Sequence, residues 1–186
     1  MEIDACVARL AACCHPCMHC LPAKGWEGWA KVVDVYNGGT FDVVAHVAGP
    51  FASACRFPVR VAGIIAFDMD DTDPDGQAMA IATRDRLLEL LLSTPPPRNA
   101  SRSQVRDAFD AETSTVHLRV RSMDKHGRAI GDVTLPASGR SVAGFLLQER
   151  LVMPFDGSYS ADCNARDARH EPAPKDAAAT VAEDLA

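Results

Sequence analysis

The segment from Val33 to Val44, VDVYNGGTFDVV, constrains the fold more than any other part of the chain. Apolar residues alternate with polar ones up to Asn37-Gly38, and the alternation resumes after Gly39. Alternation with a period of two is typical of strands, and Asn-Gly between two such runs is the strongest short-range signal for a tight reversal. The segment therefore predicts an antiparallel hairpin.

Similar patterns predict five strands in all. The runs are rich in Val and Ile and are separated by Gly, Pro or polar turns, which is the composition that favours strands. Five short strands around a small core, with packed helices, predict a compact Greek-key β-barrel of the α+β class. The predicted strands are Lys31–Tyr36, Thr40–Val47, Arg56–Ala66, Thr115–Arg121 and Ala129–Leu135.

Apolar residues at helical spacing predict two helices. The first covers Gln77–Leu92, with Asp75 as the expected N-cap and Pro95–Pro97 as the stop. Residues 98–114 read as a long polar loop with a short helix at Gln104–Phe109. The predicted buried positions are Ala78, Ile81, Ala82, Leu88, Leu91 and Leu92 in the first helix, and Val142, Phe145 and Leu146 in a second helix that runs from an N-cap at Ser141 to Arg150.

The 186 residues divide into three parts, and only the middle part has the periodicity of a folded domain. Residues 1–25 form a Cys-rich leader, residues 26–159 form the domain, and residues 160–186 form a tail rich in Ala and Asp that predicts disorder. No run of about eighteen apolar residues exists, so no membrane span is predicted. Glu2 and Asp4 occupy the place of the basic region of a signal peptide, which predicts an intracellular location, cytoplasmic or nuclear.

Charge is spread unevenly along the chain. The net charge of −6 argues against a dedicated nucleic-acid coat protein. Residues 98–128 nevertheless contain seven Lys or Arg against four acidic residues. A local basic face of this kind can meet phosphate despite the acidic total.

Four short motifs in the middle part carry a family resemblance. They are Asn37-Gly38-Gly39-Thr40, Val59-Arg60-Val61-Ala62-Gly63-Ile64-Ile65-Ala66-Phe67-Asp68, Asp124-Lys125-His126-Gly127-Arg128, and Gly139-Arg140-Ser141-Val142 followed by Leu146 and Phe155-Asp156-Gly157. In this order, over residues 28–157, they resemble the motifs of the staphylococcal nuclease (thermonuclease-like) family. The resemblance implies a five-stranded OB-fold barrel with helices and metal-assisted hydrolysis of DNA or RNA phosphodiester bonds.

Residue by residue, the resemblance implies a metal site that is broken in this chain. The family holds one calcium mainly through two Asp, and these positions are Gly39 and Ile65 here, which lack the side-chain oxygens that a hard cation needs. Asp68 stands at the position of the Glu that acts on the attacking water. Arg60 and Arg128 stand at the positions of the two phosphate-holding arginines, a role that planar guanidinium groups suit.

These departures favour a catalytically impaired nuclease that acts as a binding module. Its partner would be single-stranded nucleic acid, through Arg60, Arg128, Lys125 and the basic residues of 98–121, or else a protein. The aromatic content of 6% shifts weight toward a protein, because base stacking uses aromatic side chains. The alternative is an active calcium-dependent endonuclease with a rearranged cation site built from Asp68 and the Asp70–Asp75 loop.

The segment Asp71-Thr72-Asp73-Pro74-Asp75-Gly76 reproduces the first half of a calcium loop. The twelfth position of such a loop is Ala82 instead of a bidentate Glu, and Asp-Pro-Asp-Gly is also an ordinary turn sequence. Two interpretations follow. Asp71, Asp73 and Asp75 are displaced cation ligands near Asp68, or they form an acidic turn that caps the following helix.

Cys14, Cys17 and Cys20 in the leader have the spacing of metal ligands, and tetrahedral zinc prefers Cys and His at such separations. No second pair of ligands follows to complete a closed zinc site. The alternatives are a redox-sensitive or lipid-modifiable patch, or an unstructured leader.

Asp34 and Asp42 flank the missing ligand at Gly39 in the sequence. Strand alternation points Asp42 to the face opposite Gly39, and Asp34 is no better placed, so neither is expected to replace the ligand. Arg60 and Arg128 also have a purely structural interpretation, as ion-pair partners of Asp68 or Asp124.

Overall fold

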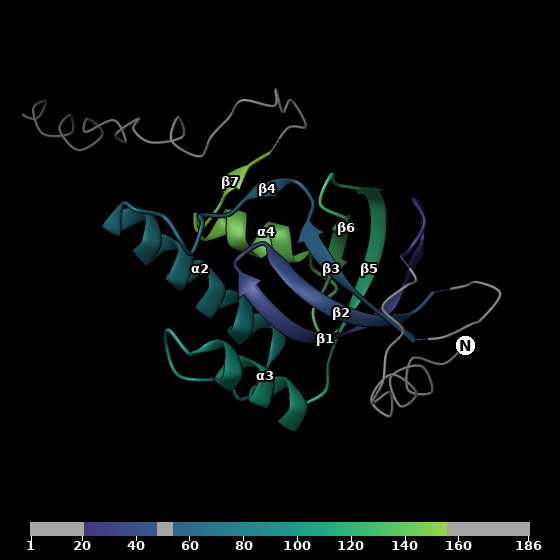
Figure 1. Ribbon diagram of the computed structural model, residues 1–186, viewed down its shortest axis with the longest axis horizontal. Helices are drawn as coiled ribbons and strands as arrows, with labels where there is room; N and C mark the ends of the chain where they lie inside the picture. Colours follow the sequence, from purple (N-terminus) through teal and green to yellow (C-terminus); the bar gives the residue numbers. More distant parts are fainter. Residues whose placement is uncertain (1–20, 48–53, 156–186) are drawn as a thin grey trace, which may run out of the picture.

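The computed structural model describes residues 21–47 and 54–155, and in these residues five strands close into a barrel (Figure 1). Neighbours in the closed order β1-β2-β3-β6-β5 are antiparallel, except that β3 runs parallel to β6. The predicted five-stranded barrel is therefore confirmed. The barrel strands are β1 (Glu27–Asn37), β2 (Thr40–His46), β3 (Ala54–Val61), β5 (Ser114–Met123) and β6 (Ala129–Thr134).

The predicted strand Arg56–Ala66 is wrong at its end, because the chain turns at Ala62-Gly63. Gly63 has a φ of +79°, a left-handed conformation that glycine adopts without steric cost. The two residues after the turn form β4 (Ile64–Ile65), which pairs with β7 (Met153–Pro154) outside the barrel. This small ribbon lies at the top of Figure 1.

The described residues contain the helices α2 (Pro74–Leu91), α3 (Arg102–Ala111) and α4 (Val142–Gln148), and none of them is long and apolar enough to cross a membrane. The predicted N-cap of α2 at Asp75 is wrong. The N-cap is Asp73, because Pro74 fits the first helical position, where its missing N–H costs nothing. Ser141 caps α4 as predicted, and its Oγ accepts a hydrogen bond from the Gly144 N–H at 2.9 Å.

Helix α3 is longer than the short helix predicted within a polar loop. Ser101 and Gln104 form a capping box, in which each side chain accepts a hydrogen bond from the backbone N–H of the other residue. Val105 and Phe109 lie one turn apart and are buried in the apolar core. The helix packs against β1, below the barrel in Figure 1.

The interior of the barrel and its covering helices share one apolar core. The ring of Trp26 meets that of Phe57 edge-on, with centroids 6.2 Å apart. Full burial of one large apolar side chain contributes about 1.5–3 kcal/mol to stability. The largest fully buried side chains include Phe41, Phe57, Leu118, Leu87, Leu88, Phe109 and Leu146, so strands and helices both contribute.

The buried face of α2 differs from the prediction in the first half of the helix. Leu88, Leu91 and Leu92 are buried as predicted, whereas Ala78 and Ala82 are exposed and Ile81 is half-buried. Two polar residues take the buried positions instead. The Thr83 hydroxyl lies 2.8 Å from the Leu151 carbonyl oxygen, and Arg84 donates to the Ala100 carbonyl at 2.9 Å. These tertiary hydrogen bonds allow polar residues on the inner face, which an apolar pattern does not reveal.

Two register shifts interrupt the pairing of β1 with β2. Val32 pairs with Val43 in the core, yet the next pair is Asp34 with Asp42, so Val33 is an extra residue in β1. Such a bulge changes which way the following side chains point. Here it places the two carboxylates opposite each other on the outer face of the barrel.

The turn Gly38-Gly39 joins β1 to β2 and refines the predicted Asn37-Gly38 reversal. Neither glycine has a positive φ, so a left-handed turn is not the reason for glycine here. A Cβ on Gly38 would lie 2.0 Å from Cγ2 of Thr83, so the close approach of the hairpin to α2 requires glycine. The Gly39 N–H donates to Asn37 Oδ1 at 3.0 Å and closes an Asx turn.

We expect Gly38→Ala to lower the free energy of unfolding by about 1–3 kcal/mol, the usual cost of overpacking a filled site. The added Cβ overlaps the Thr83 side chain, so the hairpin or α2 must shift. Urea-induced unfolding followed by circular dichroism measures the change.

The control for this substitution is Gly144→Ala in α4, where a Cβ meets only the Ser141 Oγ at 3.0 Å. Alanine favours a helix over glycine, so this variant should be as stable as the wild type or more stable. Unchanged stability of Gly38→Ala would contradict the close contact between the hairpin and α2.

Candidate functional site

Arg60 lies on β3, and Arg128 directly precedes the neighbouring strand β6 on the same outer side of the barrel. The parallel pairing of β3 with β6 matches Arg60 with Ile130, which is two residues after Arg128. Residues two apart in an extended chain point to the same side. Val59 precedes Arg60 and Ala129 follows Arg128, and these two paired residues face the core. The structure therefore brings together the two arginines that the sequence singled out.

The Arg60 side chain is half-buried and makes no hydrogen bond or ion pair within residues 21–47 and 54–155. The expected structural alternative, an ion pair with Asp68, is not formed there. Its guanidinium is therefore available to a partner molecule.

Arg128 is held by the turn that precedes β6. Its Nε donates to Asp124 Oδ2, while Asp124 Oδ1 accepts from the N–H groups of His126 at 2.8 Å and Arg128 at 2.9 Å. Burial alone raises the pKa of Asp124, but these hydrogen bonds and the Arg128 charge outweigh burial and lower the pKa below its usual value. The ion pair expected between Arg128 and Asp124 is thus formed, and Lys125 is exposed at the tip of the same turn.

Position 39 faces apolar side chains. A Cβ on Gly39 would lie 3.2 Å from the Ala66 Cβ and 3.8 Å from the Ile64 Cδ1. Ile65 lies on β4 and pairs with Met153. The two nearest atoms to a Cβ at position 39 are therefore carbon atoms, and the only side-chain oxygen among the three nearest atoms is Asn37 Oδ1 at 4.0 Å. Gly39 and Ile65 stand at the two positions where the family resemblance implies metal ligands.

Asp68 is exposed and leads into the acidic segment before α2. Its carbonyl oxygen accepts from the Asp71 N–H at 3.2 Å, and Asp71 Oδ1 accepts from the Asp73 N–H at 3.0 Å. Asp75 lies in the first turn of the helix, where a negative charge is favourable. The acidic segment therefore forms the turn that starts α2, as one of its two interpretations expected.

No three His, Cys, Asp or Glu side chains within the described ranges are grouped closely enough to hold a metal ion. This applies to Asp68 and to the carboxylates of the acidic segment. The predicted zinc ligands Cys14, Cys17 and Cys20 lie outside the described residues.

A second charged group, of which the sequence indicated only the basic residues between 98 and 121, lies where α3 meets the outer face of β1 and β2. Asp42 Oδ2 accepts from the Tyr36 hydroxyl at 2.8 Å and from Arg56 Nη2 at 2.7 Å, and Arg56 Nη2 lies 3.8 Å from Asp34 Oδ2. Helix α3 adds Arg102 and Arg106, whose Nε atoms lie 3.1 and 2.8 Å from the same Asp34 oxygen. We call Arg56, Arg102 and Arg106 the arginine cluster.

Two signals for this cluster were present in the sequence. The pattern Ser-x-x-Gln at 101–104 marks the start of α3, and on a helix Arg102 and Arg106 then share one face. The cluster also requires the bulge at Val33, which places Asp34 opposite Asp42. This bulge has no local signal in the residue pattern.

The surroundings of the cluster shift the pKa values of Tyr36 and Arg56. Burial and the hydrogen bond to Asp42 both raise the pKa of the Tyr36 hydroxyl. Burial lowers the pKa of Arg56, but its hydrogen bond to Asp42 and the nearby negative charges outweigh burial and raise the pKa. Tyr36 therefore stays neutral and Arg56 stays charged.

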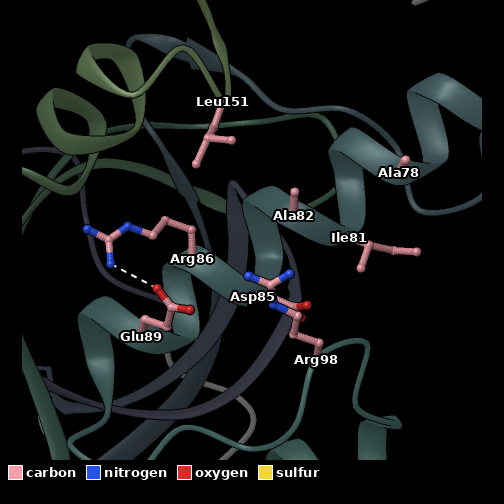
Figure 2. A pocket seen from close by; sticks show the side chains of 8 residues that line it. All are labelled: Ala78, Ile81, Ala82, Asp85, Arg86, Glu89, Arg98 and Leu151. Carbon is pink, nitrogen blue, oxygen red and sulfur yellow. Dashed lines mark hydrogen bonds and ion pairs between the residues drawn. The ribbon is translucent and has the colours of Figure 1, made fainter.

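A groove of about 460 Å³ lies on the outer side of α2, and Figure 2 shows the side chains that line it. Arg86 binds Glu89 at 2.9 Å and pairs with Glu149, with Nη2 2.7 Å from its Oε1. The charged groups of the groove thus largely neutralise one another. None of the predicted site residues lines the groove. The lining consists of Ala78, Ile81, Ala82, Asp85, Arg86, Glu89, Arg98 and Leu151.

No protein-family model matches the sequence, and a search of curated proteins finds no match.

We expect Asp124→Asn to lower the free energy of unfolding at neutral pH by about 1–2 kcal/mol, the scale of hydrogen bonds to a charged group. The pKa of Asp124 is lower in the folded state than in the unfolded chain. Its contribution is therefore present above the unfolded pKa and is lost as the pH falls through the folded pKa. The difference from wild type should shrink below about pH 4.

Urea unfolding from about pH 7 to about pH 3 measures this difference. Asp110→Asn, an exposed carboxylate on α3, is the control and should follow the wild-type profile. A difference for Asp124→Asn that stays constant down to the lowest pH would show that the carboxylate charge does not stabilise the turn.

Proposed function

We propose that this chain is a thermonuclease-like barrel of the OB-fold type that binds a partner without efficient phosphodiester hydrolysis. The strand order β1-β2-β3-β6-β5 and the single parallel pair, β3 with β6, support an OB-type barrel. Three of the sequence motifs lie on the β1-β2 turn, on and after β3 and β4, and on the turn before β6, and the described residues of the fourth lie around α4. Their placement on these elements agrees with the family resemblance.

The apolar surroundings of Gly39 carry the proposal that hydrolysis is lost. A hard cation takes several oxygen ligands, and both positions of the implied pair lack them. Ala66 and Ile64 stand directly in front of position 39. A metal that activates water and neutralises developing charge contributes several kcal/mol, so losing its ligands costs orders of magnitude in rate.

The partner proposed here is single-stranded nucleic acid. Arg60 presents a guanidinium with no described partner, Arg128 directly precedes the neighbouring strand β6, and Lys125 is exposed in the same turn as Arg128. Guanidinium groups bind phosphate bidentately, and such contacts supply most of the affinity for a polynucleotide backbone. An intracellular location remains a prediction of the sequence.

We expect short fluorescein-labelled single-stranded DNA and RNA to bind in a salt-sensitive manner, measured by fluorescence anisotropy in the presence of a chelator. Arg60→Ala should weaken binding about tenfold, the effect of losing one charge-assisted hydrogen bond. Since Arg60 has no described partner, its removal leaves the fold intact. Lys24→Ala is the control, because that side chain is exposed, carries the same charge and lies outside the proposed binding residues.

We also expect no cleavage of either nucleic acid by the wild type with calcium or magnesium, measured on denaturing gels. Cation-dependent cleavage that Asp68→Asn abolishes would instead support the nuclease with a rearranged cation site. Absence of oligonucleotide binding would contradict the nucleic-acid partner and leave a protein partner for the barrel.

A further inference from the structure

We propose that the arginine cluster is a second phosphate site for the same single-stranded nucleic acid, beside Arg60 and Arg128. This inference rests on the proposed function, since it concerns the same class of partner. It assigns a ligand to residues that lie outside the four sequence motifs.

The cluster presents positive groups outward and buries its negative groups. The side chains of Asp34 and Asp42 are 0% and 9% exposed. The arginines are 35%, 52% and 48% exposed for Arg56, Arg102 and Arg106. Three guanidinium groups face two carboxylates, so one positive charge is in excess. An incoming anion therefore meets hydrogen-bond donors and a net positive charge.

Most donors of the two α3 arginines remain available. Arg102 and Arg106 each use Nε toward one oxygen, Asp34 Oδ2, while Asp34 Oδ1 is buried without a hydrogen-bond partner among the described residues. A guanidinium has five N–H donors, so four on each arginine have no partner in the described structure. Because the carboxylate fixes each group through Nε, the terminal nitrogens are oriented for a phosphate before it binds.

Arg102 also has a fixed plane. Its guanidinium carbon lies 4.3 Å from the centroid of the Tyr36 ring, and the Tyr36 hydroxyl is bound to Asp42. One face of the guanidinium thus covers the ring, and the 52% exposure of the side chain leaves room for a planar group on its outer side. Unpaired bases stack on arginine planes as they do on aromatic rings, so this arrangement suits a single strand.

The two arginine sites are aligned along β3. Arg56, Pro58 and Arg60 alternate with core residues, so all three point outward. Four residues at about 3.3 Å each separate Arg56 from Arg60 by about 13 Å. A row of cations along one strand suits a chain of phosphates better than an isolated phosphate. It also suits nucleic acid better than a protein, whose carboxylates have no regular spacing.

The test uses the full chain and the anisotropy titration, repeated over a range of salt concentrations. The variant Asp34→Asn/Arg102→Gln/Arg106→Gln removes the buried charge together with its partners, so that no uncompensated carboxylate remains. The expected result is binding weakened by at least about tenfold. The slope of log affinity against log salt should fall by about 1.4, since each phosphate contact to a single strand contributes about 0.7.

The matched control is Lys24→Gln/Arg150→Gln, two exposed residues that belong to neither arginine site. It removes two positive charges, whereas the triple variant removes only one net positive charge. An effect of overall charge would therefore be larger in the control. We expect the control to stay within about twofold of wild type, because neither residue is placed at a proposed phosphate contact.

A measurement on the wild type avoids any effect of the substitutions on folding. The Nε–H signals of Arg102 and Arg106, assigned in nuclear magnetic resonance spectra with Arg102→Lys and Arg106→Lys, should shift on addition of the oligonucleotide. Shifts with inorganic phosphate or poly-glutamate, but none with the oligonucleotide, overturn the inference in favour of a free phosphate or an acidic protein.

The outcomes also separate this inference from the proposed function. If Arg60→Ala weakens binding and the triple variant does not, the proposed function stands and the cluster serves only to attach α3 to β1. If the wild type binds no oligonucleotide, the proposed function fails, and the inference that rests on it fails as well.

Discussion

Two carboxylates that face each other across β1 and β2 determine how the outer side of this barrel is built. Like charges at opposite positions destabilise a sheet, and the Asp34 side chain is fully buried. Arg56 lies between the two carboxylates, and α3 supplies the other cations. Leaving one partner of a buried charged set unpaired costs about 3–5 kcal/mol. Helix α3 is therefore tied to β1 by charge as well as by its apolar face.

The need to compensate the buried carboxylates also explains why the arginine side chains are held in fixed orientations. A long exposed side chain loses rotamer entropy when a ligand fixes it, at a cost of about 2 kcal/mol for arginine. In the cluster, Asp34 and Tyr36 have already imposed this order. At the other end of β3, Arg128 is fixed by Asp124 while Arg60 has no described partner. The arginine cluster thus contributes three guanidinium groups with fixed orientations. The second site contributes the fixed guanidinium of Arg128 and the unpaired one of Arg60.

Local residue patterns predicted much of the fold and only part of the site. Alternation and helical spacing located the five barrel strands and α4, and the motif Asp124–Arg128 correctly indicated a turn. The start of α2 was misplaced because Pro74 occupies its first position, and its inner face was misplaced because Thr83 and Arg84 are held inward by hydrogen bonds to distant carbonyl groups. The arginine cluster was missed because it depends on a bulge and on contacts between segments far apart in the sequence. A pattern of single residues contains neither.

Closure of the barrel sets the order in which these features form. Val59 and Ala129 meet across β3 and β6, and α2, α3 and β5 all lie between them in the sequence. Contacts of such high sequence separation are made against a large loop-closure entropy, so we expect them to form late in folding. Arg60 and Arg128 become neighbours only after this step, whereas the β1-β2 hairpin and the helices depend on earlier, more local contacts. A chain arrested before closure would keep most of its secondary structure and lack the adjoining arginines.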